Sequence, residues 1–143
     1  MKKTISSFAA ILLAALFLFN LAGCSQKVEA TGVWETATYL KNTELGKGDK
    51  TITVDVIAED KTITFTIHTN QKFLGDALTE HELIDGEEGQ FGLYIKTVNG
   101  ILADYDVDQT YWAINKNGEA TSTGADAVSI LDGDHYEIVR TTM

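Results

Sequence analysis

The sequence is poor in cysteine, proline and basic side chains. Its 143 residues include one cysteine and no proline. One cysteine excludes an internal disulfide framework and every cysteine-rich zinc pattern. The 21 acidic and 11 basic side chains give a formal net charge of −10. Nucleic-acid phosphates repel an acidic surface of this size, so nucleic-acid binding is not expected. The length allows one modest domain, with or without targeting signals, and excludes a large multidomain enzyme.

Long apolar runs are absent as well. Residues 8–19 are an unbroken run of 12 apolar residues, whereas spanning a bilayer takes about 20. Lys2 and Lys3 precede this run, and Leu-Ala-Gly-Cys follows at residues 21–24. The combination resembles a bacterial lipoprotein signal peptide with its lipobox. That resemblance implies cleavage before Cys24, thioether lipidation of Cys24 and acylation, such as with palmitate, of its new amino terminus. The alternative is a short buried helix with a buried free thiol.

The predicted signal changes what the rest of the chain is expected to be. Removal of residues 1–23 leaves 120 residues with a net charge of −12, because both signal lysines are lost. This mature chain is expected on the extracytoplasmic face of the cell membrane, anchored by the lipid on Cys24. Residues 24–50 have weak periodicity and are predicted to be a tether, with room for one early strand. Trp34 and Tyr39 lie in it and either dock on the domain or sit at the membrane interface.

The predicted domain covers residues 51–143 and begins with two alternating runs. Ile52, Val54 and Val56 share one face of the first run, as a half-buried strand requires. The second run, residues 62–68, follows a short polar break, and together the two runs predict a hairpin. Asn70 is a candidate N-cap for one short helix of about ten residues that contains residues 73–78.

Turn signals divide the remainder into short strands. An acidic loop is predicted at residues 85–89, and strands are predicted at residues 91–98, 111–116 and 136–140. Asn-Gly pairs follow the first two of these strands and an Asp-Gly pair precedes the third, as is typical of tight turns. One helix on one face of a small mixed or antiparallel sheet is an α+β arrangement.

Signatures of catalysis are missing. No serine lies in a Gly-x-Ser-x-Gly elbow, and no glycine-rich phosphate loop is present. His81-Glu82 begins like a zinc-protease helix, but Asp85 occupies the position of the second histidine. The three histidines are widely separated in the sequence. We therefore expect a non-enzymatic protein.

Alternating aspartates suggest a candidate divalent-metal site. Calcium prefers clustered carboxylate oxygens, and residues 104–108 alternate like the start of an EF-hand loop. Gln109 and Asn115 stand where that loop needs glycine and glutamate, so an EF-hand is excluded. A looser metal site and a solvated acidic face remain as alternatives. The candidate ligands are Asp104, Asp106 and Asp108, with Asp132 and Asp134 as further oxygen donors.

Aromatic side chains are the remaining candidates for ligand contacts. Tyr111 and Trp112 are adjacent on a predicted strand, so they point to opposite faces. One of them can belong to the core while the other faces solvent or a ligand. For Trp112, core packing and a ligand-facing role both remain open.

Five segments form a set of recognisable order and spacing: residues 73–78, 92–100, 111–118, 124–126 and 131–134. This set resembles the C-terminal domain of transcobalamin and intrinsic factor, and the bacterial lipoprotein domain of unknown function that is grouped with it. The resemblance covers approximately residues 52–140. It implies a β-grasp-like α+β fold, with a small sheet of about five strands and one short helix packed on one face.

The same resemblance implies a ligand. In the eukaryotic relatives this domain closes over one face of cobalamin, so a cobalamin-binding lipoprotein is the expectation. This chain lacks the large helical domain that completes the site in those relatives. The alternatives are a surface protein-interaction or adhesion module and a divalent-metal-binding lipoprotein. The positions at which ligand contact is expected are Tyr94, Tyr111, Trp112, Gly124 and Asp126.

Overall fold

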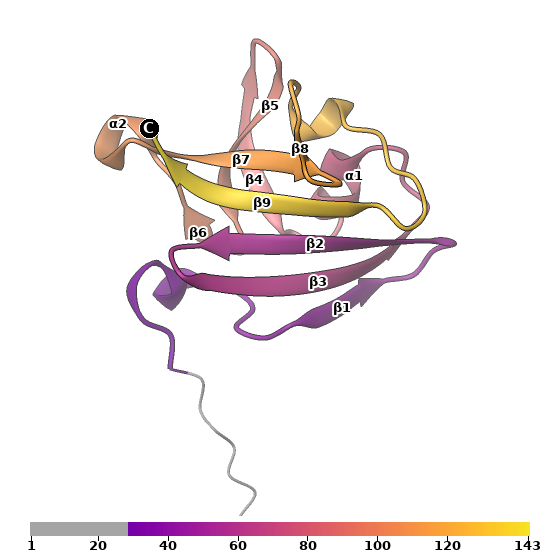
Figure 1. Ribbon diagram of the computed structural model, residues 1–143, viewed down its shortest axis with the longest axis horizontal. Helices are drawn as coiled ribbons and strands as arrows, with labels where there is room; N and C mark the ends of the chain where they lie inside the picture. Colours follow the sequence, from indigo (N-terminus) through magenta and orange to yellow (C-terminus); the bar gives the residue numbers. More distant parts are fainter. Residues whose placement is uncertain (1–28) are drawn as a thin grey trace, which may run out of the picture.

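A computed structural model describes residues 29–143 as two β-sheets with a few short helices (Figure 1). The predicted signal peptide, residues 1–23, and the lipidation site Cys24 lie outside the described residues. Within residues 29–143, no helix is long and apolar enough to cross a membrane. The arrangement is mostly β and α+β-like.

The main sheet has six strands in the order β1-β3-β2-β9-β7-β8. The pairs β1–β3 and β2–β9 are parallel, and the other neighbours are antiparallel. The sheet is therefore mixed and larger than the five strands that were predicted. Its strands are β1 (Thr43–Gly46), β2 (Lys50–Ala58), β3 (Lys61–Thr69), β7 (Thr110–Lys116), β8 (Glu119–Ala120) and β9 (His135–Thr142).

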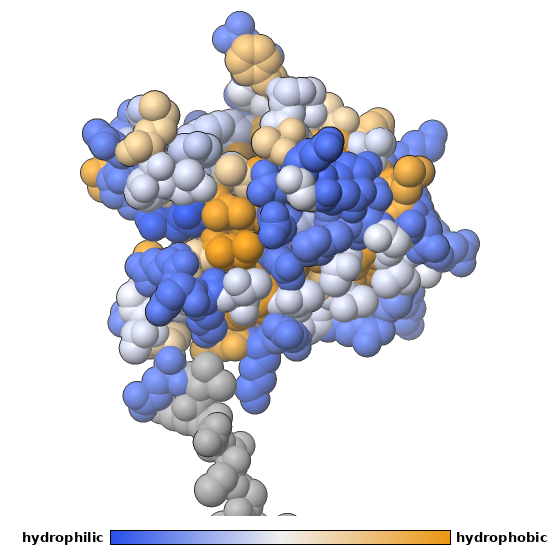
Figure 2. All heavy atoms as spheres, viewed as in Figure 1, coloured by the Kyte–Doolittle hydropathy of each residue, from blue (hydrophilic) through white to orange (hydrophobic). Residues whose placement is uncertain are grey.

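Alternation along the strands determines which face of this sheet is buried. Along β2, Ile52, Val54 and Val56 are each 1% exposed, as the sequence predicted. The inward residues of β3 include Phe65, which is fully buried. The opposite face of the sheet is open, and Figure 2 shows it covered largely by hydrophilic and neutral residues around a small apolar patch.

A second, three-stranded sheet and the helix of residues 74–79 lie behind the main sheet in Figure 1. The smaller sheet has the order β4-β5-β6. Its presence and that of a second helix were not predicted. The elements are β4 (Ile84–Gly89), β5 (Gly92–Val98), β6 (Ile101–Leu102), α1 (Leu74–Thr79), α2 (Tyr105–Asp108) and the 3-10 helices η1 (Gly32–Thr36) and η2 (Ala125–Ala127).

Two local predictions in this region are wrong. The acidic segment expected to be a loop is strand β4, because it pairs with β5 from Ile84 to Gly89 through a bulge. Helix α1 has six residues and its N-cap is Phe73. Asn70 instead accepts a hydrogen bond on its side-chain oxygen from the Asp49 N–H at 2.9 Å.

The folded part of the chain begins before residue 51. Trp34 is 2% exposed, and its indole N–H donates to the Ala58 carbonyl at 3.1 Å. The ring of Tyr39 packs edge-on against Phe65, with 5.5 Å between the ring centroids. Both aromatic residues therefore dock on the domain. The segment predicted as a tether contributes η1, β1 and part of the core.

Two Asn-Gly turns provide a matched test of close packing. Gly100 and Gly118 have φ angles of +78° and +87°. A Cβ on Gly100 would lie 2.4 Å from the Thr36 carbonyl oxygen, whereas a Cβ on Gly118 would have no neighbour within 4 Å. We expect Gly118→Ala to lower the free energy of unfolding by about 1 kcal/mol, from its φ alone. The clash should add about 1–3 kcal/mol for Gly100→Ala. Urea unfolding measures both variants. Equal losses of unfolding free energy in Gly100→Ala and Gly118→Ala would contradict the close contact between Gly100 and the Thr36 carbonyl oxygen.

Candidate functional site

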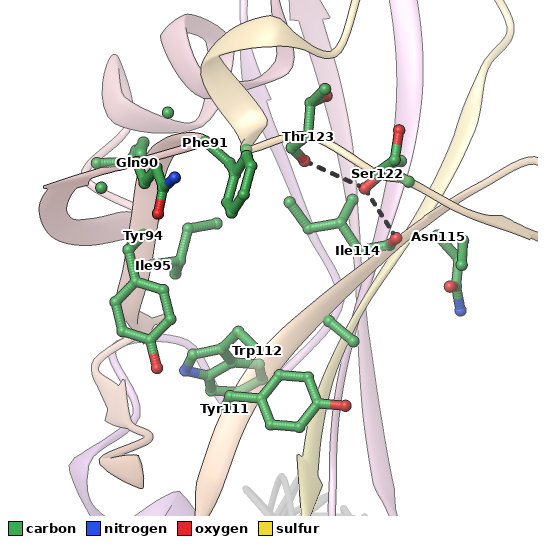
Figure 3. A pocket seen from close by; sticks show the side chains of 17 residues that line it. Gln90, Phe91, Tyr94, Ile95, Tyr111, Trp112, Ile114, Asn115, Ser122 and Thr123 are labelled. Carbon is green, nitrogen blue, oxygen red and sulfur yellow. Dashed lines mark hydrogen bonds between the residues drawn. The ribbon is translucent and has the colours of Figure 1, made fainter. Parts of the chain in front are cut away.

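A cleft of about 620 Å³ lies between strands β5 and β7 (Figure 3). It is lined by residues 89–95, 111–115 and 120–124. Neighbouring residues of a strand point to opposite faces. Consecutive residues of β5 and of β7 line the cleft, so the edges of these strands border it.

Aromatic side chains form the walls of the cleft. In Figure 3, Tyr94 and Phe91 lie on the β5 side and Trp112 lies on β7, whereas the ring of Tyr111 points away from Tyr94. Phe91 and Tyr94 are 75% and 41% exposed, whereas Trp112 is 7% exposed. The Trp112 indole N–H donates to the Lys96 carbonyl at 3.2 Å, which joins the two strands at one end of the cleft. Trp112 thus packs in the core and also lines the cleft, and its contact with a ligand stays a prediction.

The lining has no charged side chain, although 22% of the sequence is charged. The two nearby lysines are paired elsewhere. Lys96 lies 3.2 Å from Glu87, whose hydrogen bond and charge raise the pKa of Lys96. Lys116 lies 3.0 Å from Asp134. The cleft therefore favours an uncharged ligand surface, because an ion placed there would lose its hydration without gaining a partner.

The loop around Gly124 holds the β5 wall in place. The Gly124 N–H donates to the Phe91 carbonyl at 3.0 Å, and the Leu93 N–H donates to the Asp126 carboxylate at 2.9 Å. A Cβ on Gly124 would lie 2.9 Å from both the nitrogen and the oxygen of Leu93, so this contact requires glycine. Asp126 does not line the cleft but supports its wall.

Four of the five residues expected to contact a ligand thus lie together. Tyr94, Tyr111, Trp112 and Gly124 line the cleft. Sequence reasoning did not assign Phe91, although the turn between Gly89 and Gly92 presents it at the tip of the β4–β5 hairpin. This tip protrudes at the top of the view in Figure 2.

Two of the three aspartates of the candidate metal site, Asp104 and Asp108, make local structural contacts. Asp104 caps α2 by accepting the Asp106 N–H at 3.0 Å. Asp108 accepts hydrogen bonds from Thr110 and lies 2.7 Å from Arg140. The Thr110 hydroxyl bond holds the pKa of Asp108 below its ordinary value. Among residues 29–143, no group of three or more His, Cys, Asp or Glu side chains could hold a metal ion.

Asp132 and Asp134, the further oxygen donors considered for that site, bind other groups. Asp132 accepts the Thr51 N–H at 2.7 Å. Asp134 is 7% exposed and accepts the Leu131 N–H at 2.8 Å. Their carboxylates therefore stabilise the connection that leads into β9.

Comparisons with known proteins agree on the fold. Residues 71–138 match a domain of unknown function, DUF4430. A candidate metal-binding protein from Ruminococcus gnavus, solved at 1.30 Å resolution, is 41% identical with a TM-score of 0.63. The match covers 66% of this chain and 99% of that one. No curated protein matches the sequence.

Haptocorrin in complex with Cbi, cobinamide, is a more distant structural match. It is 22% identical with a TM-score of 0.50, and the match covers 68% of this chain. Only 26% of the haptocorrin chain is matched. This likeness concerns the fold alone, and it agrees with the transcobalamin-like resemblance of the sequence.

Proposed function

This chain belongs to the family of the domain of unknown function DUF4430, and from that premise we propose that it is a non-enzymatic, ligand-binding lipoprotein of the cell membrane. The observation that carries this proposal is the uncharged aromatic cleft between β5 and β7. Small-molecule sites are typically concave, largely apolar and about 300–1,000 Å³ in volume. The cleft is of that size, and its lining combines apolar and aromatic side chains with uncharged polar ones.

The candidate ligand is cobinamide or a related corrinoid. The support is the shared fold with haptocorrin, together with aromatic faces against which the rim of a corrin ring can pack. The match spans only about a quarter of haptocorrin. The cleft by itself would cover one edge of such a ligand, so we expect weak binding, with a dissociation constant in the micromolar range.

A lipid anchor on Cys24 fits the direction of the cleft. In Figure 1 the described chain begins on the side of the molecule opposite the tip of the β4–β5 hairpin. Phe91 at this tip borders the cleft. A domain anchored through its N-terminal side would therefore present the cleft away from the membrane surface.

Two exposed tyrosines provide a matched test. Tyr94 is 41% exposed and lines the cleft, whereas Tyr105 is 44% exposed and lies on α2, where its hydroxyl donates to the Met143 sulfur. We expect Tyr94→Ala to weaken cobinamide binding about tenfold, because a stacked aromatic residue contributes about 1 kcal/mol or more. Tyr105→Ala should bind like the parent protein. The measurement is a titration of residues 25–143, followed by corrin absorbance and tryptophan fluorescence.

We expect residues 25–143 to fold as a separate chain, because the Ruminococcus gnavus protein, which is matched over 99% of its length, was crystallised. Unfolding curves of both variants control for loss of structure. No spectral change at high micromolar cobinamide would refute the corrinoid proposal. Equal affinities of the two variants would place the ligand outside the cleft.

A further inference from the structure

Strand β7 has an unpaired edge that faces the cleft. β7 pairs with β9 along its whole length, but β8 pairs only with Asn115 and Lys116 on the other side. The Ile114 carbonyl accepts the Thr121 N–H at 2.9 Å on that side, whereas the Asn117 N–H donates to His135 at the β9 side. Main-chain groups alternate in direction along a strand. The N–H and C=O of Trp112 therefore point away from β9, into the cleft.

Several other edge groups around the cleft have partners. The Thr110 N–H donates to Asp108, the Leu93 N–H donates to Asp126, and the Lys96 carbonyl accepts the Trp112 indole N–H. Within residues 29–143, no strand pairs with β7 beside Trp112. The main-chain donor and acceptor of Trp112 thus lie together at an open edge. A residue of an extended peptide carries the complementary acceptor and donor.

Charge indicates which peptide fits. The cleft lining is uncharged, whereas Glu88, Glu119 and Asp126 are exposed and lie one or two positions along the chain from lining residues. The neighbouring Lys96 and Lys116 are neutralised by Glu87 and Asp134. An occupant with a neutral centre and basic ends is complementary to this arrangement.

We propose that the open edge of β7 at Trp112 binds an extended peptide, neutral over the cleft and basic at its ends, as an added strand of the main sheet. This binding mode goes beyond the proposed small-ligand function and gives the protein-interaction alternative a specific surface. Because both ligands would occupy the cleft, their binding is mutually exclusive.

The probe is the peptide acetyl-Lys-Thr-Val-Thr-Val-Thr-Lys-amide, added to 15N-labelled residues 25–143. In the free protein the Trp112 amide should exchange with solvent at least tenfold faster than those of Tyr111 and Ala113, which face β9. The peptide should slow exchange at Trp112 by tenfold or more at saturation. A second probe has both terminal lysines replaced by glutamate and should bind several-fold more weakly. The variant Glu119→Lys should reduce this preference.

A peptide that is N-methylated on every interior amide separates main-chain pairing from side-chain contact. It keeps the side chains, but neither of its edges can pair with β7, so it should not bind. Equal binding of the methylated and unmethylated peptides, or no change at Trp112 with millimolar peptide, would overturn the proposal. Cobinamide binding is measured separately by absorbance, so failure of one proposal leaves the other testable.

Discussion

Replacing Trp34 with alanine is expected to lower the free energy of unfolding by about 3–5 kcal/mol. The indole is 2% exposed among core residues and donates to the Ala58 carbonyl at the end of β2. The Lys61 ammonium lies 4.8 Å from the centroid of the Trp34 ring system. The substitution removes all these contacts and leaves a cavity that the sheet cannot fill without moving. Urea unfolding followed by circular dichroism measures the loss.

Two further variants show whether the loss comes from docking of the N-terminal segment. Trp34→Phe keeps most of the apolar contact and loses the hydrogen bond, so we expect a loss of about 1–2 kcal/mol. Val33→Ala, at a partly buried neighbouring position, should cost less than either. A Trp34→Ala variant as stable as the parent would contradict the inclusion of residues before 51 in the domain.

Alternation in the sequence predicted the long strands because each has one buried face. Residues of β2 and β3 obey this pattern, and their hairpin is confirmed. Strand β4 was missed because two of its six residues are glycine and three are acidic, and its pairing with β5 provides the stabilisation. The parallel pairs β1–β3 and β2–β9 join distant segments. No local pattern encodes such pairs.

The candidate site was predicted in part. Family resemblance pointed to Tyr111, Trp112 and the loop at Gly124, and these residues lie together in one cleft. The supporting position of Asp126 depends on the approach of its carboxylate to Leu93, 33 positions away in the sequence. The open edge at Trp112 depends on where β8 ends. Both features arise from tertiary packing, which periodicity does not report.

A buried carboxylate connects the β7–β8 turn to the start of β9. Asp134 accepts hydrogen bonds from the Leu131 N–H, the Asn117 amide and the Tyr136 hydroxyl, and pairs with Lys116. Burial by itself raises the pKa of Asp134, but the hydrogen bonds it accepts outweigh burial and lower the pKa to about 2. Burial, and then the hydrogen bond to this carboxylate, raise the pKa of Tyr136. The hydrogen bonds of the folded protein thus stabilise the ionised form of Asp134.

Replacing Asp134 with asparagine is expected to cost about 3 kcal/mol at pH 7, because the amide cannot accept all these donors and leaves Lys116 without its partner. The cost should depend on pH. The pKa of Asp134 falls from 3.8 to about 2 on folding, so its stabilisation is complete above pH 4 and is lost as the pH falls toward 2. That pH-dependent part is about 2 kcal/mol.

The measurement is urea unfolding of the parent and of Asp134→Asn at pH 7, 4 and 2.5. The difference between their free energies of unfolding should become smaller only below pH 4. Lys116→Met, which retains the other donors to the carboxylate, should cost less at pH 7. A difference in the free energy of unfolding between parent and Asp134→Asn that stays constant down to pH 2.5 would show that folding does not lower the pKa of Asp134.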